Sequence, residues 1–301
     1  MKNKKALVID GNSLIFRAFY ATLNQLDYYK NHNLLPVNAL KLVLQIVLKL
    51  TTETNYDYVL MALDHKDGKQ ALKRTELFHD YKAGRHKTPE ELIQQIPLIE
   101  QAMNIIGVNT LSISGVEADD IIGSFAKLTK DNSIPIDIYS SDRDMLQLVD
   151  NLTSVNLFKT GISNTQKITI ENFNENFFGL FPTQVVDFKG ISGDHSDNLC
   201  GVKGIGPKTA SELIKKYGSL EEIYVHLDDL TASQKEKFLQ SKEHAFLCKR
   251  LSTIQTNVLD DKTINDFVKK PIDEVAINSL INKYRFSGFE KYLTDLQKSL
   301  F

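Results

Sequence analysis

A short apolar run near the start of the chain decides the fold: residues 6–12 read ALVIDGN. The run stops at Asp10, as a buried strand does where it leaves its sheet. Similar runs recur at Tyr58–Leu63, Val108–Ser112 and Ile134–Tyr139. Helical patterns occupy the intervals, at Ser13–Leu26, Val37–Thr52, Glu90–Ile106 and Glu117–Lys130. This alternation predicts an α/β fold, with a mostly parallel central sheet flanked by helices on both faces.

The rest of the chain has a different, helical character. From about Pro182 onward the pattern is almost wholly helical and is interrupted by glycines. We therefore expect an α/β core over residues 1–181 and a helical part over residues 182–301 that packs back on it. With 301 residues, of which 42% are hydrophobic, the chain can bury one large core with an appended subdomain.

Composition argues against several classes of protein. Cys200 and Cys248 lie far apart without CxxC spacing, so neither a zinc site nor a disulfide framework is expected. The apolar run at residues 6–9 is too short for a signal peptide. The stretch Leu40–Leu50 is broken by a polar residue at every fourth position, as in an amphipathic helix. We therefore expect a cytoplasmic protein with no membrane partner. Its net charge of −2 does not exclude nucleic acid, because local patches steer charged ligands.

Residues 65–88, HKDGKQALKRTELFHDYKAGRHKT, do not fit a simple strand–helix unit. A connection of this length is usually functional or disordered. Cationic residues outnumber acidic ones here: Lys66, Lys69, Lys73, Arg74, Lys82, Arg85 and Lys87 against Asp67, Glu76 and Asp80. The excess of positive charge favours a functional insertion that faces an anion.

Acidic residues gather where the predicted strands end. They are Asp10 and Asp64 after the first two strands, Glu117, Asp119 and Asp120 at the start of a helix, Asp142 and Asp144 after a later strand, and Asp194 and Asp197 in GDHSDN. Because the carboxyl ends of parallel strands share one edge of a sheet, several of these acids should converge. Converging carboxylates repel each other and must protonate or bind cations. A donor set made only of oxygen suits Mg²⁺ or Mn²⁺.

Taken singly, each of these acids has a simpler explanation. Asp10 or Asp64 alone is more often a helix cap or a turn residue. Acids in the first turn of a helix commonly do no more than mark its N-terminus. The DxD at Asp142–Asp144 is a weak motif by itself. Their joint occurrence at successive strand ends nevertheless favours a metal site.

A second motif is GVKGIGPKTASELIKKYG, residues 201–218. Gly204 and Gly206 permit backbone angles closed to other residues and let a phosphate approach the main chain. The proline that follows suits the first turn of a helix whose free amides point outward, and Lys203 and Lys208 flank that point. The pattern predicts a helix–hairpin–helix that grips duplex backbone without reading its sequence. The alternative is a packing corner that uses glycines for tightness.

Together these motifs resemble those of the 5′ nuclease family: the flap endonucleases and the N-terminal 5′→3′ exonuclease domain of bacterial DNA polymerase I. The matching stretches run in the family's order over the whole chain: LVIDGNSLIFRAFYA, DYKAGRHKTPEEL, GVEADDIIGS, YSSDRDMLQLV and GISGDHSDNLCGVKGIGPKTA. Several motifs in order are far more specific than any one of them. The resemblance implies a free-standing nuclease module with a PIN-like core. Cys200 stands where a proline is usual and His195 where a glutamate is typical, but neither departure removes an acid.

The resemblance also implies roles for individual residues. Two metal ions, Mg²⁺ or Mn²⁺, would be held by Asp10, Asp64, Glu117, Asp119, Asp120, Asp142, Asp144, Asp194 and Asp197. The residues expected to act in catalysis are Asp10, Asp64, Glu117, Asp119, Asp142, Asp144, Lys82 and Arg85. The insertion at 65–88 resembles an arch through which a free 5′ end threads. The residues expected to contact DNA are Arg17, Arg74, Tyr81, Lys82, Arg85, Lys203, Gly204, Gly206, Lys208 and Thr209. The hairpin would hold K⁺ through main-chain oxygens.

We therefore expect a structure-selective 5′→3′ exonuclease and 5′-flap endonuclease that hydrolyses DNA phosphodiesters, with roles in RNA primer removal and DNA repair. Two metal ions about 4 Å apart would bind the attacking water and the leaving oxygen. The expected partners are DNA with 5′ flaps, nicks or gaps, and RNA primer–DNA hybrids, and the chain should act as a monomer. One alternative is a non-catalytic DNA-junction binding protein, against which the full acid set argues. The other is a PIN-like ribonuclease, against which the basic insertion and the hairpin argue.

Overall fold

The computed structural model describes residues 4–67, 73–84, 87–159, 164–286 and 288–298. The strands within these ranges form a six-stranded sheet in the order β3-β2-β1-β4-β5-β6. They are β1 (Ala6–Asp10), β2 (Tyr58–Ala62), β3 (Asn109–Leu111), β4 (Ile136–Ser140), β5 (Thr153–Phe158) and β6 (Thr165–Ile168). All neighbouring strands are parallel except β5 and β6, which are antiparallel. The predicted α/β class with a mostly parallel sheet is confirmed.

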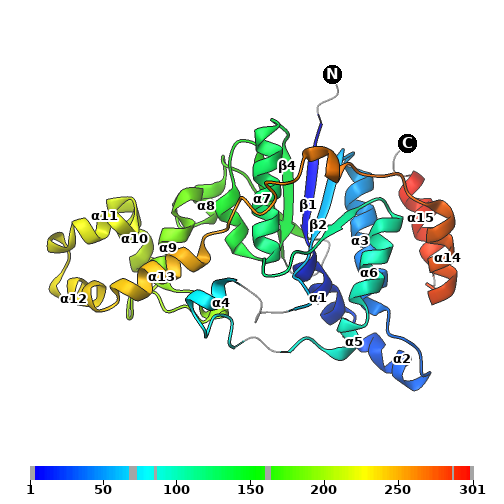
Figure 1. Ribbon diagram of the computed structural model, residues 1–301, viewed down its shortest axis with the longest axis horizontal. Coiled ribbons are helices and arrows are strands. Elements are labelled where there is room, and N and C mark those ends of the chain that lie inside the picture. Colours follow the sequence, from blue (N-terminus) through cyan, green and yellow to red (C-terminus); the bar gives the residue numbers. More distant parts are fainter. Residues whose placement is uncertain (1–3, 68–72, 85–86, 160–163, 287, 299–301) are drawn as a thin grey trace.

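Helices connect and cover the strands (Figure 1). Those of the first half are α1 (Gly11–Ala21), α2 (Leu26–Asn31), α3 (Asn38–Glu53), α4 (Lys73–Leu77), α5 (Glu90–Ile93), α6 (Ile96–Ile105) and α7 (Ala118–Asp131). Those of the second half are α8 (Phe173–Asn176), α9 (Val185–Ser192), α10 (Pro207–Tyr217), α11 (Leu220–Val225), α12 (Ala232–Gln240), α13 (Lys242–Ser252), α14 (Glu274–Tyr284) and α15 (Phe289–Lys298). Short 3-10 turns lie at Leu23–Gln25, Arg143–Leu148, Pro182–Gln184, His195–Asp197, Leu227–Asp229 and Ile264–Phe267.

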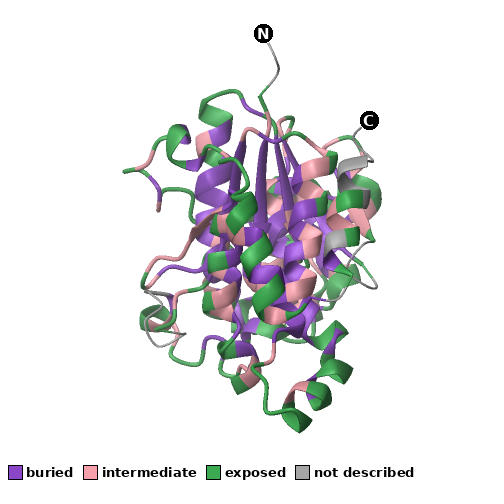
Figure 2. Cartoon of the chain, turned by 90° about the vertical axis from the view of Figure 1, so that its right-hand side faces the viewer, coloured by how far each residue is buried: buried purple, intermediate pink, exposed green. Residues whose placement is uncertain are grey.

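Side chains of β1 alternate between the two faces of the sheet. Leu7 and Ile9 belong to the hydrophobic core formed with α1, α3 and α6, whereas Ala6 and Val8 belong to the core formed with α7. Every residue of this strand is buried. A parallel strand covered on both faces needs apolar side chains at every position, which is why ALVI is a continuous run. Figure 2 shows the strands as buried, with helices on both sides of them.

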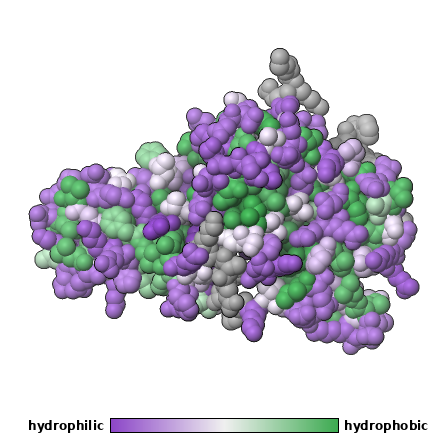
Figure 3. Space-filling model, in the orientation of Figure 1, coloured by the Kyte–Doolittle hydropathy of each residue, from purple (hydrophilic) through white to green (hydrophobic). Residues whose placement is uncertain are grey.

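A helical lobe extends from one side of the sheet. The helices α10, α11 and α12 project to the left in Figure 1, and α9 and α13 join them to the sheet. The visible surface of this lobe is largely hydrophilic, with scattered hydrophobic residues (Figure 3). The core on the α7 side of the sheet continues into the lobe through Phe173, Leu213 and Phe238. The lobe and the sheet therefore share one hydrophobic core.

The last part of the chain returns to the opposite side of the sheet. Residues 264–273, which we call the strap, pass the start of β2. The Lys269 amide donates to the Asp57 carbonyl at 2.8 Å and the Lys270 amide to the Gly107 carbonyl at 3.0 Å. Beyond the strap, α14 and α15 lie on the side of α3 and α6 (Figure 1). The helical segment that follows residue 182 therefore lies in two places, on opposite sides of the sheet.

Three features differ from the sequence-based expectations. The strands β5 and β6 were not predicted, and the expected helix Glu90–Ile106 is broken between α5 and α6. At the break, the Gln95 side chain accepts hydrogen bonds from the amides of Ala39 at 2.9 Å and Leu40 at 3.2 Å. It thereby caps α3, whose own N-cap residue forms no side-chain hydrogen bond.

None of the helices in the described ranges combines the length and the apolar character that crossing a bilayer requires.

Candidate active site

Asp10 stands at the carboxyl edge of the sheet, as predicted for the end of the first strand. Its Oδ1 accepts a hydrogen bond from the Ser13 amide at 2.9 Å, so the side chain also caps α1. Its Oδ2 accepts from the Ser140 hydroxyl at 2.5 Å. Burial raises the pKa of Asp10 to about 6, against the opposing effect of these two hydrogen bonds. The prediction that Asp10 caps a helix is therefore confirmed, and its position at the edge of the sheet is the one that the metal-site prediction requires.

Two neighbouring strands bring further acids to the same edge. After β2, Asp64 accepts from the Asn12 side chain at 3.0 Å and from the Ala118 amide at 2.9 Å, which ties it to the first turn of α7. After β4, the Ser140 hydroxyl that donates to Asp10 also accepts from the Asp142 amide at 2.9 Å. Sheet order explains the convergence, because β2 and β4 are the two neighbours of β1.

Asp119 completes this group from the first turn of α7. Burial, with Asp142 and Asp10 nearby, raises the pKa of Asp119 well above its usual range. Asp142 and Asp64 in turn raise the pKa of Asp10. These acids share one electrostatic environment, and their mutual repulsion is the feature that a bound cation would relieve.

Glu117 and Asp120, on the other side of the α7 N-terminus, are already paired with cations of the insertion. Arg74 donates to both oxygens of Asp120, at 2.7 and 2.8 Å, and also contacts Glu117. The Lys82 ammonium contacts Glu117 as well. Burial would raise the pKa of Glu117, but Lys82 and Arg74 outweigh it and lower that pKa. Asp120 also accepts from the Gln255 amide at 2.8 Å.

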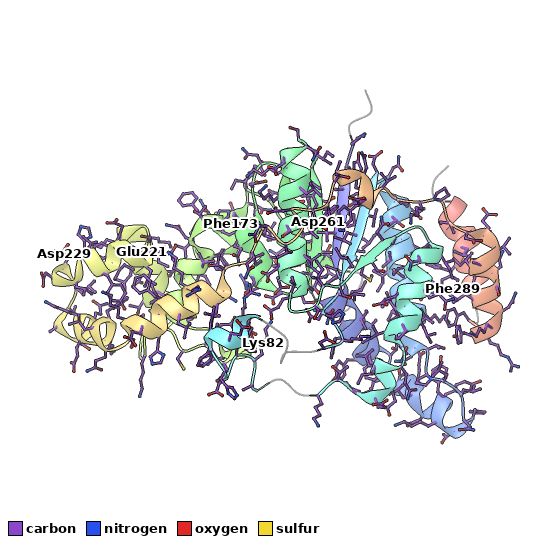
Figure 4. The ribbon with its side chains drawn as sticks, viewed as in Figure 1. Lys82, Phe173, Glu221, Asp229, Asp261 and Phe289 are labelled. Atoms are coloured by element: carbon purple, nitrogen blue, oxygen red, sulfur yellow. The ribbon has the colours of Figure 1, made fainter. Side chains whose placement is uncertain are left out.

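Tyr81 and Lys82 lie inward, at the base of the insertion. The Tyr81 hydroxyl lies 3.2 Å from both Glu117 and Asp197, and its side chain is only 2% exposed. Lys82 has a left-handed backbone, with φ of 57°, which turns its side chain toward Glu117. Figure 4 shows Lys82 next to α4, between the helical lobe and the sheet. In this form Tyr81 is not open to stack on a base, and Arg74 is buried among acids; their predicted DNA contacts require another arrangement of the insertion.

A second cation, Lys189 of α9, lies between Asp144 and Asp194. Its ammonium is 2.6 Å from Asp194 and contacts Asp144. Burial would lower the pKa of Lys189, but the two carboxylates raise it. Burial and the nearby Asp142 raise the pKa of Asp144 to about 8, although Lys189 opposes this. Asp194 also accepts from the Ser196 amide and hydroxyl, at 2.9 and 2.6 Å.

The acidic residues supply the all-oxygen donors that Mg²⁺ or Mn²⁺ prefers, so their chemistry fits such an ion. Within the described part of the chain, however, no three acidic, histidine or cysteine side chains are arranged to hold one ion as they stand. Lys82, Arg74 and Lys189 neutralise part of the acidic set, namely Glu117, Asp120, Asp144 and Asp194. A metal ion would compete with these side chains for the same oxygens.

The glycine hairpin lies apart from these acids, at the start of α10. Gly204 has a positive φ of 80°, but Gly206 has a φ of −89° that any residue can adopt, so the expectation of special backbone angles is wrong for Gly206. A Cβ at Gly206 would meet no atom within 4 Å, so a phosphate has room to approach. Lys203 and Lys208 are exposed and Thr209 is half-buried. The Gly204 carbonyl, a candidate ligand for the predicted K⁺, accepts a hydrogen bond from Lys237 at 3.2 Å.

Arg17 and Arg85 are the two remaining residues that were predicted to contact DNA. Arg17 is half-buried and donates to Ser141 at 3.0 Å and to the Lys159 carbonyl at 2.5 Å, so it braces the loop after β4. Arg85 lies outside the described residues. No sequence motif pointed to Ser140, which joins Asp10 to Asp142, or to Lys189. In the sequence, Lys189 is marked only as the single lysine of the mostly apolar segment VVDFKGIS, which also contains Asp187.

Known families match the chain along most of its length. The model of the 5′-3′ exonuclease N-terminal resolvase-like domain matches residues 5–178, and that of the 5′-3′ exonuclease C-terminal SAM fold matches residues 180–275. The 5′-3′ exonuclease of Mycoplasma pneumoniae is 39% identical over 293 residues, which are 97% of this chain and 100% of that protein. The DNA polymerase I of Lactococcus lactis subsp. lactis is 39% identical over 297 residues, which are 97% of this chain but 33% of that protein.

Solved structures share the fold at lower identity. The T5 D15 protein co-crystallised with metal ions has a TM-score of 0.69 and 23% identity, over 88% of this chain and 98% of that one. The catalytic core of Rad2 in complex with DNA substrate has a TM-score of 0.61 and 14% identity, over 99% and 93%. At this identity they establish the architecture alone. Both family models match this chain, and so does a Mycoplasma relative over its entire length. This chain therefore belongs to the 5′-3′ exonuclease family.

Proposed function

We propose that this 5′-3′ exonuclease hydrolyses DNA phosphodiesters at 5′ ends and 5′ flaps, using two divalent ions, Mg²⁺ or Mn²⁺, at the carboxyl edge of the sheet. The observation that carries the proposal is the burial of Asp10 and Asp119 beside Asp142: burial first, and then repulsion from the neighbouring carboxylates, raises the pKa of Asp10 and Asp119. Folding three carboxylates together costs stability unless cations neutralise them. The T5 D15 protein, which shares the fold, was crystallised with metal ions.

The first group of ligands would be Asp10, Asp64, Asp119 and Asp142. None of them forms a hydrogen bond or ion pair with a lysine or arginine of the described residues, although the charge of Lys82 also acts on Asp119. The second would be Asp144, Asp194 and Asp197, with Glu117 and Asp120 supporting the site through their cations. When bound, the ions would lower the pKa of a water and stabilise charge on the leaving oxygen. The Ser140 hydroxyl fixes the relative positions of Asp10 and Asp142.

The cations of the insertion would serve the DNA. Lys82 and Arg85 would stabilise charge on the scissile phosphate. Electrostatic stabilisation of charge that develops in the transition state is usually the largest single contribution to catalysis. Lys203, Lys208 and the open approach to Gly206 would hold the backbone of the duplex. Nicked, gapped and flapped DNA and RNA primer–DNA hybrids are the proposed substrates, cleaved during primer removal and repair.

Cleavage of a 5′-flap duplex in Mg²⁺ tests the proposal. Asp119→Ala and Asp142→Ala are each expected to abolish cleavage, because each removes a ligand from the most crowded part of the site. Both should leave DNA binding in Ca²⁺ within about threefold of the parent. The matched control is Asp131→Ala at the far end of α7, which removes only an exposed ion pair with Lys127. Near-normal turnover of either site variant would overturn the metal assignment.

The same assay separates the alternatives. A DNA-junction binding protein would bind the flap tightly and cut nothing in Mg²⁺ or Mn²⁺. A ribonuclease would cut single-stranded RNA faster than the flap. The proposal requires that the flap duplex be cut at its junction or from its 5′ end, and that single-stranded RNA be cut more slowly.

A further inference from the structure

Lys237 lies outside every motif discussed so far, yet it contacts the glycine hairpin directly. It is in the last turn of α12, and its ammonium donates to the Gly204 carbonyl at 3.2 Å. A Cβ at Gly204 would lie 3.2 Å from Lys237 Cε and 3.4 Å from its Nζ, so the side chain lies across the glycine. Ser241, just beyond α12, accepts from the Lys203 amide at 3.2 Å. The end of α12 therefore braces the hairpin at two points.

The charge of Lys237 is not balanced by a carboxylate within the described part of the chain. Among the described residues no acidic side chain forms an ion pair with it, whereas Lys235 on the same helix pairs with Asp228 at 2.5 Å. Its neighbours along the hairpin are Lys203 and Lys208, which are cationic too. An ammonium group has three donors, and the Gly204 carbonyl takes one of them. Two N–H groups and a full charge remain for an anion.

A simpler role is available for a lysine in the last turn of a helix. A cation there offsets the negative end of the helix dipole, worth about 0.3–1 kcal/mol. The hydrogen-bond acceptor of the Lys237 ammonium, however, is a carbonyl of the hairpin and not one of α12. The dipole alone does not explain why the side chain crosses Gly204.

We propose that Lys237 is the built-in cation of the glycine hairpin. It occupies the Gly204 carbonyl, where a K⁺ ion was predicted, and gives a third lysine contact to the phosphate backbone of duplex DNA. The hairpin then needs no monovalent ion from solution. This inference rests on the proposed binding of duplex DNA by the hairpin.

The salt dependence of duplex binding tests the phosphate contact. Fluorescence anisotropy with a nicked duplex in Ca²⁺, between 50 and 200 mM salt, would compare the full chain with Lys237→Met, which keeps the alkyl stem and loses the charge. The slope of log K against log salt should become shallower by about 0.9, the value of one phosphate contact. Over that range the variant should lose roughly three- to fourfold less affinity than the parent. Lys235→Met, on the same helix, should leave the slope unchanged, and Lys237→Arg should restore it.

Exchange of K⁺ for Na⁺ at equal ionic strength tests the cation role. The parent should bind equally well in both salts, because Lys237 already holds the carbonyl. Lys237→Met should bind more tightly in K⁺ than in Na⁺, because the ion can then take the vacated position. A parent that prefers K⁺, with the same preference in the variant, would overturn this role. An unchanged salt slope in Lys237→Met would overturn the phosphate contact.

Two controls keep these outcomes separate. If Lys203→Ala/Lys208→Ala also leaves the slope unchanged, the proposed duplex binding by the hairpin is itself wrong. If that double variant makes the slope shallower by about two units and Lys237→Met by none, only the inference about Lys237 fails. Thermal melting checks the fold, and Lys237→Gln is the second uncharged variant should Lys237→Met melt early; it must then show the same loss of slope.

Discussion

Both carboxylate oxygens of Asp10 have structural partners, and the proposed metal site would use the same oxygens. It caps α1 through the Ser13 amide and is tied to β4 through the Ser140 hydroxyl, while burial raises its pKa to about 6. A carboxyl whose pKa is higher in the folded chain than in the unfolded one costs stability once the pH exceeds the unfolded value. The cost grows between pH 4 and 6 and is complete above that.

Asp10→Asn should therefore make the metal-free chain more stable at pH 8 while abolishing cleavage. Asparagine still caps a helix, and it carries no charge to bury. The gain should be on the order of 1–3 kcal/mol at pH 8 and should vanish near pH 4, where the aspartate is protonated in the folded chain. Urea unfolding in EDTA at both pH values measures it. Asp131→Asn, at an exposed position of α7, is the control and should change little. Equal stability of parent and variant at pH 8 would contradict the buried-charge argument.

The part of the insertion around Tyr81 and Lys82, between β2 and α5, is anchored against the acidic site and the helical lobe. Tyr81 packs with Leu199, Cys248 and Leu251, and its hydroxyl reaches Glu117 and Asp197. Lys82 beside it neutralises Glu117. Arg74 and Lys82 of this insertion are thus counter-ions of the acidic site in the structure. When substrate and metal ions bind, the cations would pair with the substrate phosphate and the carboxylates would bind the metal ions.

Lys82→Ala should slow the chemical step more than it weakens binding. Loss of one preorganised charge at a developing negative charge costs on the order of 10²-fold in rate. Single-turnover kinetics on a 5′-flap substrate, with enzyme in excess, gives the rate, and anisotropy in Ca²⁺ gives the dissociation constant. Lys87→Ala, an exposed lysine of the same insertion, should change the single-turnover rate by less than about threefold. A Lys82 variant with the parent's rate and only a raised dissociation constant would show that the insertion merely tethers DNA.

At the scale of the whole molecule, the strap carries the chain past the sheet to α14 and α15. It hydrogen-bonds to Asp57 before β2 and to Gly107 before β3, and it leads into α14, which packs through Ile277 and Leu280 into the core on the side of α3 and α6. The approach to Gly107 is close: a Cβ there would lie 1.9 Å from the Lys270 carbonyl oxygen. Only glycine allows the strap to lie where it does, since φ at Gly107 is also positive.

Gly107→Ala should lower the free energy of unfolding without changing the catalytic groups. The left-handed backbone costs about 1–2 kcal/mol with a side chain, and displacement of the strap adds to this, for roughly 2–5 kcal/mol in all. Gly288→Ala is the matched control, because Gly288 also has a positive φ but open space around its Cβ. Urea unfolding should show a clearly larger loss for Gly107→Ala. Equal losses would mean that the strap adjusts freely and does not hold α14 in place.

Much of this molecule follows from local rules. A continuous apolar run predicts a strand covered on both faces, and parallel strands place their carboxyl ends at one edge, so Asp10, Asp64 and Asp142 were bound to meet there. The hairpin was predictable because glycine, proline and lysine have short-range backbone and charge preferences that GVKGIGPK displays openly. The hairpin depends on residues within a few positions of one another, and the acids depend on the common direction of parallel strands, so the sequence alone could reveal both.

The tertiary structure alone decided which cations meet which acids. Arg74 reaches Asp120 across 46 residues and Lys189 reaches Asp144 across 45, and nothing in the spacing of either pair foretells it. The contact of Lys237 with Gly204 joins α12 to the glycine hairpin before α10 in the same way, across 33 residues. An ion pair forms where long connections happen to bring charges together, and burial then sets its strength. Such partners depend on the path of the whole chain, whereas the acids at strand ends depend only on the sheet.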